Sequence, residues 1–174
     1  DEVLRVARES VPELMSCLPA DTDHLRQIEH WLQTNVERKR QAFARRKSAG
    51  HIREGHGDLH LANLVLLDGQ VVPFDCIEFS EDLRWIDIAS ELAFTYIDLL
   101  DHDRADLASW LLNEWLSSSG DYSALSMFRF YGVYRALVRA KVAARTRDAD
   151  ATAGYLRLAD ALIASGHPRL LITH

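Results

Sequence analysis

The residues with the clearest chemical potential lie together near the middle of the chain. They read His56-Gly57-Asp58-Leu59-His60-Leu61-Ala62-Asn63, and Asp75 follows twelve residues after Asn63. A carboxylate five residues before an amide, with a second carboxylate beyond a short turn, has the residue types and spacing of a phosphoryl-transfer centre. Such chemistry depends on positioning and charge neutralisation, and needs no covalent intermediate on the protein.

Each of these side chains has a role that its chemistry suits. Asp58 would accept the proton of an acceptor hydroxyl held in line with a terminal phosphate. The amide oxygen of Asn63 and the carboxylate of Asp75 would bind Mg²⁺, which prefers oxygen ligands. His60, two residues after Asp58, would donate a hydrogen bond near the transferred phosphate, or would only orient the loop.

The local sequence predicts how these residues are brought together. Residues 53–63 carry glycines and histidines with few helix signals, and we expect a loop there. Two apolar runs, 64–67 and 70–74, flank Asp68-Gly69, a pair typical of a two-residue type I′ turn with positive φ at both positions. The resulting hairpin would return the chain so that Asp75 faces Asn63.

The rest of the chain has the apolar spacing of helices. We expect helices over residues 3–18 (interrupted by Pro12), from 21 or 23 to 49, and over 85–101, 104–118, 123–147 and 150–165. The predicted fold class is therefore α+β, mainly helical, with one small β-hairpin.

Composition narrows the functional class. The chain has 174 residues, 48% of them hydrophobic, and a formal net charge of −6. This is a globular composition without the basic excess of a dedicated nucleic-acid binder, so we expect no nucleic-acid partner. No apolar run approaches membrane-spanning length. Cys17 and Cys76 cannot form a disulfide framework, which favours a reduced, cytoplasmic setting.

The central stretch resembles the aminoglycoside phosphotransferase-like kinases, a branch of the protein-kinase-like fold. The motifs that carry the resemblance are His56 to Asn63, Phe74-Asp75-Cys76-Ile77-Glu78-Phe79, and Asp87-Ile88-Ala89. The resemblance implies a kinase C-terminal lobe that binds ATP and Mg²⁺. Asp58 would be the catalytic base, and Asn63 and Asp75 the metal ligands, which also hold the nucleotide phosphates.

The resemblance implies further roles around this centre. Glu78 would approach a second metal or the substrate, and Asp87 would brace the catalytic loop from the start of its helix. We expect His56 to be structural and to bond the loop backbone. Cys76, and Glu81-Asp82-Leu83 in place of the frequent Gly-Asp-Pro, depart from the family pattern and leave the hydroxyl acceptor, a small molecule, unspecified.

The domain organisation follows from what the kinase resemblance requires. Residues 1–168 would be the C-terminal lobe, because no glycine-rich hairpin and no lysine in a strand context precede residue 56. The N-terminal lobe is then absent from this sequence, and we expect the isolated lobe to be inactive. Residues 169–174 resemble the first strand of a following P-loop domain.

Two other functions compete with the kinase interpretation. A pseudokinase lobe that senses nucleotide and regulates a fused domain would have the same fold. His56-x-Asp58-x-His60 also suits a zinc-dependent hydrolase, although alternate residues of an extended chain point to opposite sides. We expect the basic residues to lie on solvated helix faces: Arg38, Lys39, Arg40, Arg45, Arg46, Lys47, Arg135, Arg139, Arg145 and Arg147. We expect the tryptophans to lie in the core: Trp31, Trp85, Trp110 and Trp115.

Overall fold

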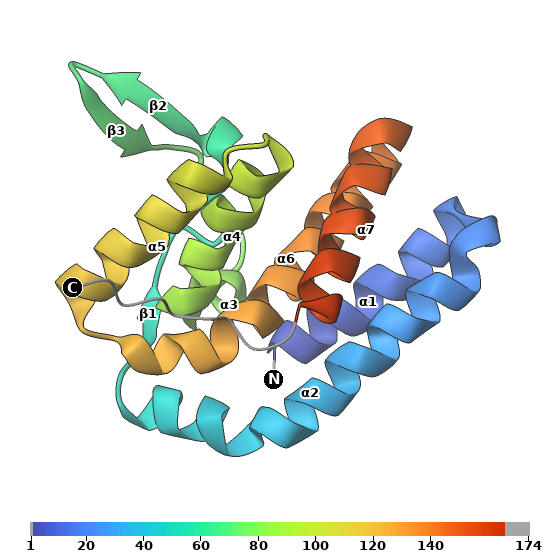
Figure 1. The fold of residues 1–174 in the computed structure, drawn as a ribbon, viewed down its shortest axis with the longest axis horizontal. Helices are drawn as coiled ribbons and strands as arrows, with labels where there is room; N and C mark the ends of the chain where they lie inside the picture. The colour runs from blue at the N-terminus through green and yellow to red at the C-terminus, as the bar shows by residue number, and fades with distance from the viewer. Residues whose placement is uncertain (1, 166–174) are drawn as a thin grey trace.

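The structure, a computed structural model, describes residues 2–165 and the side chains from Ser10 onward (Figure 1). The strand predicted at 169–174 lies outside the described residues. The longer helices are α1 (Glu2–Cys17), α2 (Thr22–Ser48), α4 (Ile88–Asp101), α5 (Ala105–Ser119), α6 (Leu125–Arg145) and α7 (Ala149–Ala164). The mainly helical α+β class is confirmed. No helix within the described range is both long and apolar enough to cross a membrane.

Helix α6 lies at the centre of the helical body and packs against α7, α4 and α1. Its residues are buried on nearly all sides, and Phe130, Val133 and Leu137 are at most 1% exposed. An all-round buried helix is expected where other helices enclose it. Helix α4 packs against this core, and α4 in turn contacts the central loop.

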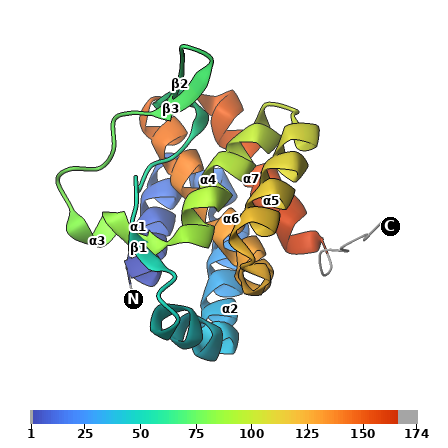
Figure 2. The same ribbon diagram turned by 90° about the vertical axis from the view of Figure 1, so that its left-hand side faces the viewer.

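The predicted hairpin is present. Strands β2 (Leu64–Leu67) and β3 (Gln70–Pro73) pair antiparallel across a two-residue turn. Asp68 and Gly69 have φ values of 50° and 78°, the positive values that a type I′ turn needs. Figures 1 and 2 show the hairpin projecting from the helical body.

A second small sheet was not predicted. Strand β1 (Ile52–Glu54) pairs antiparallel with β4 (Trp85–Asp87), and the short helix α3 (Glu81–Arg84) precedes β4. The predicted loop therefore begins as a strand, and the helix predicted from Trp85 starts three residues later, at Ile88. A three-residue strand owes its conformation to a distant partner, which local periodicity does not reveal.

Two further expectations were wrong. Helix α1 continues across Pro12, which is exposed and removes only the one N–H bond of its own position. Trp31 and Trp115 pack against the core, but Trp85 and Trp110 are 53% and 61% exposed. Trp85 is on a strand of the small sheet and Trp110 is on the outer side of α5.

Candidate functional site

The carboxylate of Asp58 is the focus of the central loop. Its side chain is 39% exposed, and Nε2 of His60 lies 3.4 Å from Oδ2. Nδ2 of Asn63 donates to the backbone oxygen of Asp58 at 2.9 Å and approaches Oδ2 at 3.4 Å. His60 and Asn63, both from the same loop, therefore hold Oδ2 of the accessible Asp58 carboxylate in place.

Electrostatics keeps this carboxylate charged. Partial burial alone would raise the pKa of Asp58, but the hydrogen bond from His60 and the positive charges of His60, Arg135 and Arg139 act more strongly together. The net effect lowers the pKa below its ordinary value of 3.8. Asp58 is thus ionised at neutral pH, as a general base that accepts a hydroxyl proton must be.

His60 is the fixed partner of Asp58. Its ring meets the edge of Phe94 with centroids 5.6 Å apart, and its side chain is only 12% exposed. Nδ1 is buried and has no hydrogen-bond partner among the described residues. Because Nε2 points at Asp58, His60 orients the carboxylate. The same contact leaves His60 poorly placed to donate a hydrogen bond to a phosphate.

Asn63 connects the loop to the hairpin. It is 7% exposed, and both of its side-chain bonds use Nδ2, so Oδ1 takes part in neither. Its backbone oxygen accepts from the N–H of Phe74 at 3.0 Å, which closes the base of the hairpin. Asp75 is the residue after Phe74, so this backbone bond brings Asp75 near Asn63 in the chain's path.

Asp75 has an unusual backbone. Its φ is 59°, in the left-handed region that non-glycine residues rarely occupy, and its side chain is exposed together with those of Cys76 and Glu78. Left-handed non-glycine residues are enriched at functional sites. The exposed carboxylate of Asp75 and Oδ1 of Asn63 are oxygen ligands of the type that Mg²⁺ prefers.

His56 joins the loop to the same hairpin base. Nδ1 accepts from the backbone N–H of Asp58 at 3.3 Å, so Nε2 carries the proton that it donates to the oxygen of Phe74 at 2.7 Å. The backbone oxygen of His56 also accepts from Ile77. His56 therefore bonds the loop backbone, as predicted, and holds the residues on both sides of Asp75.

The zinc interpretation finds little support in these bonds. Both ring nitrogens of His56 are engaged, which leaves no lone pair for a metal. Across residues 2–165, no three His, Cys, Asp or Glu side chains come together as a metal-binding group.

Asp87 is structural and lies at the start of its helix, as expected, although its other side-chain partners lie on α2 and α6. It is the N-cap of α4, and Oδ1 accepts from the N–H of Ala89 at 2.9 Å. Its two oxygens also bond Arg46 at 2.5 and 2.8 Å and the hydroxyl of Tyr131 at 3.0 Å. Asp87 therefore joins α4 to α2 and α6, while the bonds that brace the catalytic loop come from other residues.

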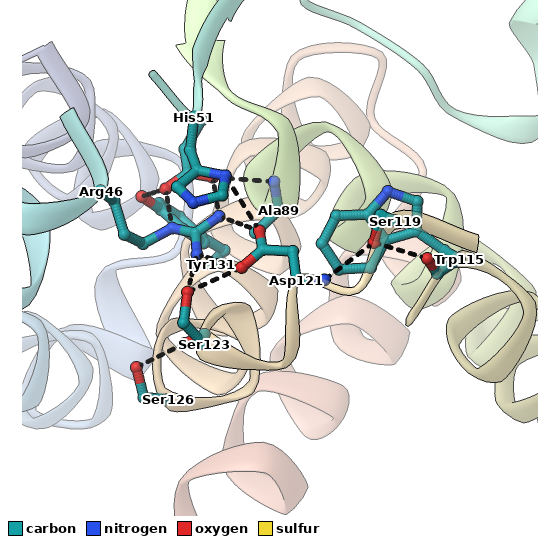
Figure 3. A network of polar contacts seen from close by, with 10 residues as sticks. Arg46, His51, Ala89, Trp115, Ser119, Asp121, Ser123, Ser126 and Tyr131 are labelled. Atoms are coloured by element: carbon teal, nitrogen blue, oxygen red, sulfur yellow. Dashed lines mark hydrogen bonds and ion pairs between the residues drawn. The ribbon is translucent and has the colours of Figure 1, made fainter. Parts of the chain in front are cut away.

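Arg46 is the centre of a buried network, shown in Figure 3. It is 3% exposed, and its five N–H groups reach Asp87, Asp121 and Ser123. His51 lies 3.2 Å from Asp121. The solvated face predicted for Arg46 is wrong, because two carboxylates on other elements meet it inside the protein.

Arg135 is also buried, at 5% exposure, contrary to the same expectation. It donates to the backbone oxygen of Gly57 at 3.1 Å and to Ser90, and its guanidinium lies over the ring of Phe94. Its place between α4 and the loop accounts for its burial. Arg145 and Arg147 are exposed, as predicted.

Three residues of α4 contact the loop. Glu91 accepts from the backbone of His56 and Gly57, Thr95 donates to Leu59, and Asp98 accepts from Leu61. The available signal was their spacing, since residues 91, 95 and 98 are polar positions on one face of a mainly apolar helix.

The chain is similar in sequence to proteins whose names state no function. The chain is 39% identical over 120 residues to uncharacterized proteins of Mycobacterium bovis and Mycobacterium tuberculosis. The match covers 69% of this chain and 24% of each relative, so the chain spans about a quarter of the length of the relatives it matches. No protein-family model matches the chain. No solved structure matches it.

Proposed function

We propose that this chain is the C-terminal lobe of an ATP-dependent kinase, akin to the aminoglycoside phosphotransferases, that phosphorylates a hydroxyl of a small molecule. The observation that carries the proposal is the ionised, accessible carboxylate of Asp58, held by Asn63 and His60 on a loop with kinase spacing. The hairpin that closes on Asn63 supports it further, because Asp75 follows at its base.

Asp58 would orient the acceptor hydroxyl and accept its proton as the phosphoryl group is transferred. Asn63 and Asp75 would hold Mg²⁺ through their oxygens, and the exposed Glu78 is free to approach a second ion or the substrate. Mg²⁺, when bound, would neutralise charge on the phosphate oxygens. His56 and His60 would keep the loop and the carboxylate in place.

The remaining parts of a kinase would come from outside this chain. An N-terminal lobe would cover the nucleotide, and we propose a fused P-loop domain as a further partner. We expect negligible phosphotransfer from the 174 residues alone. We also propose a cytoplasmic location, because Cys17 and Cys76 are both free and exposed thiols.

Replacing Asp58 with Asn in the natural protein that carries this chain tests the proposal. The variant keeps the side-chain shape but removes the base, and we expect ATP-dependent turnover to fall by about 10²–10⁴-fold. The measurement is ADP release from Mg-ATP with a panel of sugars, polyols and amino alcohols, together with the ATP affinity, which should be unchanged.

Asp68→Asn is the matched control, because Asp68 is an exposed carboxylate at the tip of the adjoining hairpin. Near-wild-type turnover of Asp58→Asn would remove Asp58 from the base role. The pseudokinase alternative would be favoured by a wild-type protein that binds ATP and alters the activity of a fused domain but phosphorylates none of the acceptors tested.

A further inference from the structure

One face of α4 carries three polar side chains at buried or partly buried positions. Residues 91, 95 and 98 are separated by four and three positions, so Glu91, Thr95 and Asp98 lie along one stripe of the helix. Thr95 is 7% exposed and Asp98 is 1% exposed. Buried polar groups on an apolar helix need partners, and these three find theirs in one segment of backbone.

Glu91 binds the segment before Asp58. Oε2 accepts from the N–H of His56 at 2.7 Å and from that of Gly57 at 3.1 Å, and Oε1 lies 3.2 Å from Gly57. A Cβ at residue 55 would lie 2.2 Å from Oε2, so Gly55 is the residue that lets the carboxylate come so close. Charged acceptors form the stronger class of hydrogen bond.

Thr95 and Asp98 bind the segment after Asp58. Oγ1 of Thr95 donates to the backbone oxygen of Leu59 at 2.6 Å, and Oδ2 of Asp98 accepts from the N–H of Leu61 at 2.8 Å. The stripe therefore bonds backbone groups from residue 56 to residue 61, in order along the helix. Asp58 lies between the bonded groups.

The stripe is itself anchored to the core. Oδ1 of Asp98 accepts from the hydroxyl of Tyr155 on α7 at 2.5 Å, and Nε of Arg139 on α6 lies 3.6 Å away. Asp98 therefore links the loop backbone to side chains on both α6 and α7.

We propose that Glu91, Thr95 and Asp98 are positioning residues that set the direction of the Asp58 carboxylate by fixing the loop backbone on both sides of it. This inference rests on the proposed function, because it assigns these residues to the same site. A reacting group misplaced by about 1 Å can cost about 10²-fold in rate, so the loss of one such bond should appear in turnover.

Thr95→Val is the sharpest test, because it removes only the hydroxyl while keeping the side-chain volume, and Thr95→Ser restores the donor. Thr152→Val is a matched control. Thr152 is 2% exposed, and its Oγ1 also donates to a backbone oxygen at 2.6 Å, that of Asp148 on the approach to α7. Both substitutions remove a threonine hydroxyl that donates to a backbone oxygen, but the Thr152 bond is local to the start of α7 and only the Thr95 bond reaches the loop.

In the natural protein we expect Thr95→Val to lower the kcat for ADP release by about tenfold, the effect of one hydrogen bond, with the KM for ATP unchanged. Thr95→Ser should recover most of the rate, and Thr152→Val should retain it. Hydrogen exchange measured by mass spectrometry supplies a second readout. Exchange of the peptide spanning residues 56–63 should rise about tenfold in Thr95→Val only.

These outcomes separate the two proposals. A wild-type protein without turnover, in which Thr95→Val still accelerates exchange in residues 56–63 alone, would refute the kinase function and support the positioning of the loop. Equal behaviour of Thr95→Val and Thr152→Val in both measurements would overturn the inference, as would a lost rate that Thr95→Ser fails to restore.

Discussion

Replacing Arg46 with Met should destabilise the chain strongly, because it leaves two buried carboxylates without their cation. The side chains of Asp87 and Asp121 are only 2% and 7% exposed, and both bond Arg46 directly. Met has a similar length, so the change removes the charge and the five donors with little change in volume. Tyr131 and Ala89 would remain as the partners of Asp87.

The expected magnitude follows from the burial of this network. Removing one partner of a buried ion pair costs about 3–5 kcal/mol, and one kcal/mol shifts the Tm of a chain of this size by about 2–4 °C. We therefore expect Arg46→Met to lower the Tm by about 10 °C. Arg45 is the neighbouring, exposed arginine on the same helix, and Arg45→Met should cost no more than about 0.5 kcal/mol.

The pH dependence gives the same prediction an independent check. Burial would raise the pKa of Asp121, but hydrogen bonds from Arg46 and Ser123 and the charges of Arg46 and His51 lower it overall, below 3.8. A depressed carboxylate pKa stabilises the fold above about pH 4, and this stabilisation is lost as the pH falls through the folded-state value. Without Arg46 the pKa of Asp121 loses the main causes of its lowering, so this carboxylate protonates more readily.

The Tm difference between the wild type and Arg46→Met should therefore narrow as the pH falls below about 4, toward the folded-state pKa of Asp121. Circular dichroism melts of the chain and of both arginine variants at several pH values measure this. The reasoning is refuted if Arg46→Met melts within about 2 °C of Arg45→Met at neutral pH, or if the difference does not change with pH.

Substitutions of Gly57 and His60 test the loop itself, with Gly69 in the hairpin turn as the control for Gly57. Gly57 and Gly69 both have positive φ, at 85° and 78°, but a Cβ at Gly57 would lie 2.8 Å from the backbone oxygen of Leu83, whereas at Gly69 it would meet nothing within 4 Å. In urea titrations, Gly69→Ala should cost about 1 kcal/mol and Gly57→Ala at least about 2 kcal/mol; equal losses would contradict the close packing of the loop. His60→Ala should raise the pKa of Asp58 from its depressed value, because it removes the hydrogen bond and charge that lower it, and a carboxyl NMR titration showing no rise would contradict that cause.

The sequence alone predicted the features that depend on neighbouring residues. Asp68-Gly69 defined the turn because its positive φ values are a local property of those two residue types. The apolar period located the long helices, and the spacing of Asp58, Asn63 and Asp75 identified the stretch where the site is proposed. The hairpin base that joins Asn63 to Phe74 follows from the same turn and register.

Only the tertiary structure decided which polar residues support that stretch. Arg46 and Arg45 are adjacent on one helix and look alike in sequence, yet one is buried because Asp87 and Asp121 converge on it from other elements. The strand at 52–54 exists because a distant segment pairs with it. Whether a polar side chain contacts water or a protein partner depends on which element packs opposite it. Because that packing is set by the whole folded chain, no local sequence pattern predicts it.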